Sequence, residues 1–130
     1  DDGLGIVHAE RGMRHAIKMA LKNGVGIVGI SHSSHCGAIG LYTREATHEG
    51  LIGIAFTHAS AIVVPHTEDP TAKRRFFGTN PISIAFPRED GPALCLDMAT
   101  SQIATAGVRN RGETRRIAVD PGSPPSRAKA

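Results

Sequence analysis

Short apolar runs constrain the fold of this chain more than any other feature of its sequence. Five of them, at residues 25–30, 51–58, 62–65, 81–87 and 93–99, are long enough for strands and too short for ordinary helices. Helical spacing of apolar residues occurs in two other segments. Residues 8–22 form the first and stop before Gly24, and residues 38–49 form the second and stop before Gly50. The sequence therefore predicts several strands and two helices.

The order of these segments predicts an α/β (α+β) fold. The later runs follow one another without helices long enough for parallel crossovers, which favours a mixed sheet covered by helices. The runs at 25–30 and 51–58 carry no charge, which is typical of strands buried on both faces. Pro81 and Pro87 favour an edge position or strand ends for the run between them.

In the second predicted helix, Ile39, Tyr42 and Ala46 fall on one face and are expected to point inward. No G-x-G-x-x-G segment follows the first apolar run, so the fingerprint of a Rossmann dinucleotide site is absent from the sequence.

Length and charge indicate one globular core and a basic tail. The 130 residues are 40% hydrophobic, which is ordinary for a single globular domain. We expect that core at 1–108, followed by a poorly ordered tail at 109–130 that is rich in Pro and Arg. The residues after Ser101 carry a net charge of +4 and the others −1, so the net charge of +3 originates in the tail.

These properties exclude two classes of partner. Aromatic residues make up 4% of the chain and leave few platforms for stacking bases, so no nucleic-acid partner is predicted. No apolar run approaches the roughly 20 residues of a membrane span, and the start at Asp1 lacks the features of a signal peptide. We therefore expect a cytoplasmic protein with no membrane partner, in which Cys36 and Cys95 are reduced.

The polar segment "SHSSHCG" at residues 31–37 is the first candidate site. It lies between a predicted strand and a predicted helix N-terminus, which is expected near residues 36–38 and whose free N–H groups attract anions. His35 stands beside that helix end and can change its charge near neutral pH, as an acid/base catalyst must. A loop whose histidines make only local hydrogen bonds explains the same residues.

Two other chemistries fit this segment less well. A metal site would use His32, His35 and Cys36, but adjacent residues rarely converge on one ion and no second ligand cluster follows, so no metal is predicted. A Ser-His-Asp hydrolase would combine Ser33 or Ser34 with His35 and Asp97, but the chain has no G-x-S-x-G turn.

Two further motifs follow later in the chain. "GTNP" at residues 78–81 is typical of a tight turn. "DMATS" at residues 97–101 places a carboxylate at the end of a predicted strand. Asp97 either caps a helix that leads into Gln102 or lines a pocket at the end of the sheet, together with the small residues after it.

Taken in order, "SHSSHCGAIG", "GTNPISIAFP" and "LDMATS" resemble the malate/L-lactate dehydrogenase family. The resemblance extends over residues 1–101. Members of this family are NAD(P)-dependent 2-hydroxyacid oxidoreductases, among them ureidoglycolate and sulfolactate dehydrogenases. The resemblance implies a non-Rossmann cofactor-binding domain and, as substrate, a small 2-hydroxy or 2-oxo acid.

The resemblance also assigns roles to single residues. His35, in "HCGA", matches the family's active-site acid/base. Ser60, Asp97, Met98 and Ala99 match positions that contact the cofactor. Gly37 joins this group because a helix N-terminus attracts phosphate or carboxylate.

Some features depart from the family. Residues 66–77 replace its usual glycine pair with a longer segment, and His58 is an unusual occupant of its position. Lys73, Arg74 and Arg75 would favour the phosphate of NADP, so the sequence leaves NAD and NADP open.

The family's N-terminal helical segment and its C-terminal part, with much of the dimer contact, have no counterpart in these residues. We therefore expect an internal fragment with an incomplete substrate pocket and little or no turnover, taken from a protein that is a homodimer at full length. The alternative is a truncated dinucleotide-binding module without catalysis.

Overall fold

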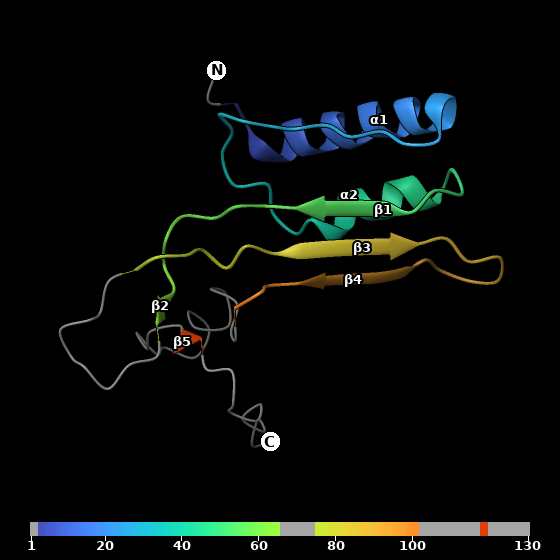
Figure 1. The fold of residues 1–130 in the computed structure, drawn as a ribbon. Helices are drawn as coiled ribbons and strands as arrows, with labels where there is room; N and C mark the ends of the chain where they lie inside the picture. Colours follow the sequence, from blue (N-terminus) through green and yellow to red (C-terminus); the bar gives the residue numbers. More distant parts are fainter. Residues whose placement is uncertain (1–2, 66–74, 102–117, 120–130) are drawn as a thin grey trace. The chain divides into compact units, whose positions relative to one another are not determined.

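The computed structural model describes residues 3–65, 75–101 and 118–119, and its helices and strands are shown in Figure 1. The elements in chain order are α1 (Gly5–Asn23), α2 (Gly40–Thr47), β1 (Gly53–Phe56), β2 (Val64–Pro65), β3 (Ile82–Phe86), β4 (Leu94–Met98) and β5 (Ala118–Val119). Two compact units divide the chain. The first contains residues 1–58 and 81–98, and the second contains residues 59–80 and 99–130.

The first unit contains an antiparallel sheet with strand order β1-β3-β4. Its register sets Ile84 opposite Ile54 on one side and opposite Leu96 on the other. Pro81 and Pro87 lie just outside β3, which is the central strand. The prolines thus mark strand ends, and the alternative of an edge position is wrong.

Helix α2 lies between the sheet and α1 (Figure 1). Ile39, Tyr42 and Ala46 are buried, as their helical spacing predicts. The sheet approaches the helix so closely that a Cβ atom added at Gly53 would overlap the carbonyl oxygen of Thr43. Small residues on this face of the sheet therefore allow α2 to pack against it.

Two buried hydroxyl groups join α2 to the sheet. The side chains of Thr43 and Ser83 are fully buried, and their oxygens lie 2.8 Å apart. Ser83 donates its proton to the carbonyl oxygen of Leu96 at 2.8 Å. The single hydroxyl proton of Thr43 has two acceptors, the hydroxyl oxygen of Ser83 and the carbonyl oxygen of Gly40 at 3.3 Å. Each buried polar atom of this chain of hydrogen bonds is satisfied.

We expect Ser83→Ala to lower the free energy of unfolding by about 1–2 kcal/mol, because it leaves the buried hydroxyl of Thr43 and the carbonyl of Leu96 without this partner. Urea denaturation followed by circular dichroism measures the loss. Ser33→Ala, at an exposed serine of the same unit, is the control. Equal stability of the two variants would contradict the prediction.

Helix α1 begins three residues before the predicted start and ends one residue after the predicted end, directly before the predicted stop at Gly24. Gly24 follows it with a φ of +83°, and its N–H donates to the carbonyl oxygen of Ala20 at 2.7 Å. This left-handed conformation favours glycine and stops the helix.

The apolar run at residues 25–30 is not a strand, and the prediction of a strand buried on both faces is wrong. The segment is extended along α1 (Figure 1), where a Cβ atom added at Gly26 would overlap the backbone of Ala16. Alternate side chains point away from the helix, so Ile27 is 85% exposed. The segment has the β-branched composition of a strand, but no strand of the described residues pairs with it.

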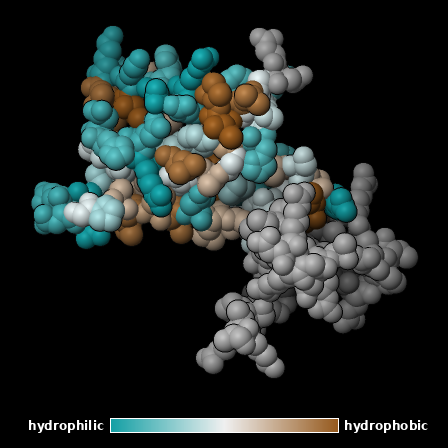
Figure 2. All heavy atoms as spheres, turned by 180° about the vertical axis from the view of Figure 1, so that it is seen from behind, coloured by the Kyte–Doolittle hydropathy of each residue, from teal (hydrophilic) through white to brown (hydrophobic). Residues whose placement is uncertain are grey.

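The sheet face opposite α2 is apolar and exposed. Its register brings together Ile54 and Phe56 of β1 with Leu96 and Met98 of β4, and Phe56 is 71% exposed. The strand prediction for residues 51–58 is confirmed, but its burial on both faces is wrong. Figure 2 shows the molecule from behind, where exposed hydrophobic side chains lie among hydrophilic ones.

The second unit contains the parallel pair of β2 and β5. An isolated antiparallel bridge joins Val63 to Phe77, and Val63 is buried. Most of the tail at residues 109–130 lies outside the described residues, as do Lys73 and Arg74. None of the described helices is long and apolar enough to cross a membrane. The predicted α/β class is confirmed, with antiparallel and parallel pairing in separate sheets.

Candidate functional site

The loop that carries His35 is anchored to the first turn of α1. Gly5 donates its N–H to the hydroxyl oxygen of Ser34 at 2.9 Å, and Ser34 donates its own N–H to the carbonyl oxygen of Gly3 at 3.1 Å. Ser34 thereby satisfies one of the free N–H groups that begin a helix. A Cβ atom at Gly5 would overlap the carbonyl oxygen of Ser34, so the close approach requires glycine there.

The peptide unit between Cys36 and Gly37 is held at both of its polar atoms. Its N–H, on Gly37, donates to Nδ1 of His35 at 2.8 Å. Its carbonyl oxygen, on Cys36, accepts a hydrogen bond from the phenol of Tyr42 in α2. Gly37 has a φ of +76°, a conformation that favours glycine. His35 itself is exposed at the end of this loop.

The pKa of Tyr42 is raised above its ordinary value of 10.0. Burial of the phenol is the main cause, and the negative charges of Cys36, Glu10 and Glu45 add to it. The phenol therefore keeps its proton at neutral pH and remains a donor to Cys36.

This shift has a measurable consequence because Tyr42 is the only tyrosine and the chain has no tryptophan. We expect the tyrosinate absorbance to appear at higher pH in the folded chain than in urea. Since the unfolded state loses this proton first, stability is retained below pH 10.0 and falls as the pH rises above it. Coincident titration curves in buffer and in urea would contradict the prediction.

Asp97 reaches across to the start of α2. Its Oδ2 atom accepts the N–H of Gly40 at 2.7 Å, and a carboxylate at a helix N-terminus is stabilised by the helix dipole. The helix thus begins at Gly40, later than the predicted start near residues 36–38, and Gly37 lies three residues before it. Met98, which ends β4, is 51% exposed.

In the second unit, three segments that are distant in sequence lie together. The side-chain oxygen of Asn80 accepts the N–H of Ala59 at 3.1 Å. Thr100 donates its hydroxyl proton toward the carbonyl oxygens of Thr79 and Asn80, each at 3.1 Å. The "GTNP" turn is therefore joined to the segments that contain Ser60 and Ala99.

The predicted residues consequently fall into two groups. His35 and Gly37 precede α2, Asp97 bonds its first residue, and Met98 follows Asp97; all four belong to the first unit. Ser60 and Ala99 belong to the second unit.

Sequence reasoning placed Tyr42 in the core and missed its contact with the loop. The available signal was a tyrosine at a predicted inward position, since a buried phenol needs a hydrogen-bond partner.

The other two chemistries considered for this loop find no support in its hydrogen bonds. Ser33 bonds the carbonyl oxygen of Ser34, and the side chains of Ser34, His35 and Asp97 bond Gly5, Gly37 and Gly40 respectively. In the described part of the chain, no hydrogen bond joins either serine to His35, or His35 to Asp97, so the structure shows no Ser-His-Asp relay. Among the described residues, no group of three His, Cys, Asp or Glu side chains is arranged to hold a metal ion. Both cysteines are free thiols.

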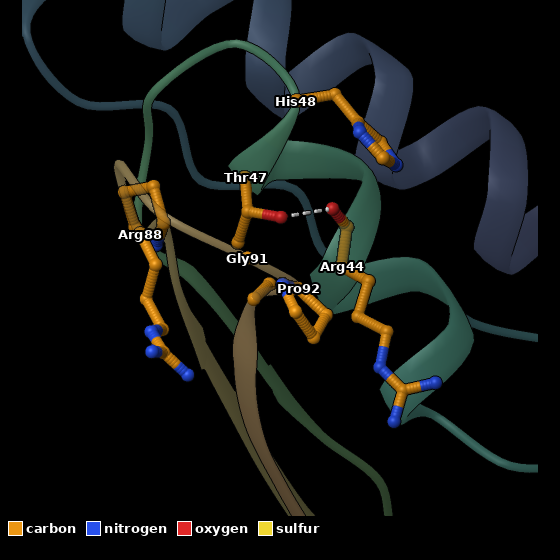
Figure 3. A pocket seen from close by; sticks show the side chains of 8 residues that line it. Arg44, Thr47, His48, Arg88, Gly91 and Pro92 are labelled. Atoms are coloured by element: carbon orange, nitrogen blue, oxygen red, sulfur yellow. Dashed lines mark hydrogen bonds between the residues drawn. The ribbon is translucent and has the colours of Figure 1, made fainter.

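A pocket of about 620 Å³ lies at the other end of α2, between its last turn and the loop that joins β3 to β4 (Figure 3). Arg44, His48, Arg88 and Pro92 contribute to its lining. Figure 3 shows Arg44 and Arg88 extending on opposite sides of Pro92. Cations near the last turn complement the negative end of the helix dipole. No residue predicted for the site lines this pocket.

Comparison with known proteins identifies the class of protein that has this arrangement. The model of the malate/L-lactate dehydrogenase family matches residues 1–117. The NAD(+)-dependent ureidoglycolate dehydrogenase of Escherichia coli O157:H7 is 38% identical over 131 residues, covering 97% of this chain and 36% of that protein. The malate dehydrogenase of Pyrococcus horikoshii is 45% identical over 103 residues, covering 79% of this chain and 27% of that protein.

Solved structures agree with these relatives. The structure of malate dehydrogenase from Pyrococcus horikoshii OT3 matches with a TM-score of 0.75 and 40% identity, over 84% of this chain and 30% of that one. Sulfolactate dehydrogenase from Methanocaldococcus jannaschii matches with a TM-score of 0.73 and 36% identity, over 85% and 30%.

These relatives are hydroxyacid oxidoreductases, and this chain shares the fold of the corresponding part of their structures. The chain belongs to the malate/L-lactate dehydrogenase family. It spans about a third of the length of the curated relatives that it matches.

Proposed function

We propose that this chain is the part of an NAD(P)-dependent 2-hydroxyacid dehydrogenase that carries the acid/base histidine and much of the cofactor contact. The observation that supports this most directly is His35, an exposed imidazole on a loop fixed to both helices of a family member. The substrates we propose are small 2-hydroxy and 2-oxo acids, because relatives are named for ureidoglycolate, malate and sulfolactate.

In this proposal His35 exchanges a proton with the substrate oxygen. Oxidation of the alcohol carbon requires that its hydroxyl proton leave as the hydride leaves, and an imidazole near neutral pH can accept that proton and later return it. A bound nicotinamide supplies the other half of the chemistry by taking up or giving back the hydride.

The side chains proposed to hold the cofactor suit it chemically. The hydroxyl of Ser60 is exposed and makes no hydrogen bond with the described part of the chain, so it is available to a ribose or phosphate oxygen. Asp97 accepts the N–H of Gly40 with one carboxylate oxygen, and we propose that its other oxygen contacts the cofactor. Met98 offers exposed apolar surface to the cofactor, and Gly37 and Ala99 have no large side chain that would obstruct its approach.

Three further properties belong to the proposal. Both NAD and NADP are candidates, and NAD(+) is the cofactor in the name of one relative. We also propose a cytoplasmic location and a homodimer for a protein of the relatives' full length.

The test measures cofactor binding and hydride transfer on the same sample. The purified chain is titrated with NADH and NADPH by fluorescence, and is then mixed with NAD(+) or NADP(+) and either malate or ureidoglycolate while reduced nicotinamide is followed by absorbance. We expect cofactor binding and a slow single-turnover reaction that depends on His35. Binding without any transfer would replace the proposal by a dinucleotide-binding module, and absence of binding would refute both.

A further inference from the structure

The peptide unit between Cys36 and Gly37 connects the buried phenol of Tyr42 to the imidazole of His35. Tyr42 donates to the carbonyl oxygen of this unit, and the N–H of the same unit donates to Nδ1 of His35. Both hydrogen bonds polarise the peptide in the same direction, and consecutive hydrogen bonds of this kind strengthen one another.

This arrangement determines where the proton of a neutral His35 lies. A backbone N–H can only donate, so Nδ1 must be the acceptor and must carry a lone pair. A neutral imidazole has one N–H, which therefore lies on Nε2.

We propose that Tyr42 is a positioning residue for His35: through the Cys36–Gly37 peptide it holds the imidazole as the neutral tautomer protonated at Nε2. The inference rests on the proposed function for its meaning in catalysis, but the tautomer can be observed without any reaction.

Three features of the structure support a fixed rather than a fluctuating contact. Tyr42 is only 6% exposed and belongs to a helix packed between α1 and the sheet. Ser34, the residue before His35, accepts a hydrogen bond from Gly5 in α1 and donates one to Gly3 just before that helix. Gly37 adopts a φ of +76°, which sets the direction in which the chain leaves the Cys36–Gly37 peptide toward α2 and Tyr42.

The tautomer has a consequence for proton transfer. With Nδ1 bonded to Gly37 and the proton on Nε2, His35 donates a hydrogen bond to an approaching oxygen but has no free lone pair with which to accept a proton. The imidazolium, which must carry a proton on Nδ1, likewise cannot keep the bond to the N–H of Gly37. Oxidation therefore requires Nδ1 to leave Gly37 before it takes up the proton. Reduction starts from the imidazolium, in which this bond is absent, and Nδ1 can return to Gly37 once its proton has left. Tyr42 stabilises the neutral, bonded state.

The test is the ¹⁵N chemical shift of the histidine ring nitrogens in the whole chain at alkaline pH, where imidazoles are neutral. We expect His35 to give the signals of a single tautomer, with Nδ1 unprotonated and Nε2 protonated. Tyr42→Phe keeps the ring and removes the hydroxyl, and we expect it to shift both His35 signals toward those of an imidazole that exchanges between tautomers. His32, in the same loop but outside this peptide, is the internal control and should not move.

A second pair of variants keeps the test decisive if Tyr42→Phe fails to fold. Gly37→Ala and Gly50→Ala each place a side chain where φ is positive, +76° and +70°, and where nothing lies within 4 Å of the new atom. Both should cost a similar amount of stability, but only Gly37→Ala should change the His35 tautomer.

A wild-type His35 protonated at Nδ1, or equal His35 signals in all folded variants, would overturn the proposal. Loss of hydride transfer alone would leave it standing, because the tautomer is read in the absence of cofactor.

Discussion

Replacing His35 by alanine is expected to slow hydride transfer to a 2-oxo acid, or from a 2-hydroxy acid, by about 10²- to 10⁴-fold, the usual contribution of a positioned acid/base group. The side chain is exposed and its removal deletes one hydrogen bond, to Gly37, so the fold should survive. Single-turnover absorbance of reduced nicotinamide gives the rate, and fluorescence titration with NADH gives the affinity of the cofactor. We expect the rate to fall and the affinity to change little.

His32→Ala is the matched control for this prediction. His32 lies in the same loop, is exposed, and contacts only the neighbouring hydroxyl of Ser31 at 3.2 Å within the part of the chain that the structure describes. Its removal should leave the rate of hydride transfer close to that of the original chain. A His35→Ala rate equal to that of His32→Ala would show that proton transfer does not use His35.

The largest expected effect on stability comes from Gly53→Ala, which should lower the free energy of unfolding by about 3 kcal/mol, the upper end of the usual cost of overpacking. A Cβ atom at Gly53 would overlap the carbonyl oxygen of Thr43, and that obstacle is backbone rather than the movable end of a side chain. Relief would require α2 to move away from the sheet, which would also disturb the hydrogen bond between Thr43 and Ser83. Urea denaturation of both chains measures the difference.

Gly29→Ala controls for the intrinsic effect of replacing a glycine. Nothing lies within 4 Å of a Cβ atom at Gly29, and its φ is not positive. Alanine there restricts the unfolded chain and should leave stability unchanged or raise it by about 0.4–1 kcal/mol. If Gly53→Ala were as stable as Gly29→Ala, the close packing of α2 on the sheet would be wrong.

The spacing of apolar residues, glycines and prolines along the chain predicted those features of the fold that depend on neighbours close in sequence. Ile39, Tyr42 and Ala46 were placed inward because their positions recur at the period of a helix, and burial confirms them. The stop of α1 at Gly24 follows from the conformational freedom of one residue. Pro81 and Pro87 marked the ends of β3 because proline cannot donate within a strand ladder.

What depended on distant neighbours was not predictable in the same way. The run at residues 25–30 has the composition of a buried strand, but composition does not reveal whether another strand pairs with it, and here α1 takes that place. The bond from Asp97 to Gly40 joins residues 57 positions apart, so the sequence could suggest a cap for a following helix but not this contact with the first residue of α2. The link from Tyr42 to Cys36 requires the turn at Gly37, which becomes evident only from its dihedral angle.

The shortness of α2 determines how the loop of His35 can open. Isolated helices shorter than about 12–15 residues are marginal in water, and α2 has eight. It can persist only while α1 and the sheet pack on both of its sides. Local fraying of α2 is therefore coupled to separation of these layers, and the amide protons of Tyr42 and Thr43, bonded to Ile39, should exchange with solvent only when the whole unit unfolds. Slow exchange at these two amides, beside fast exchange in residues 31–37, would mean that the loop of His35 moves while α2 stays folded between α1 and the sheet.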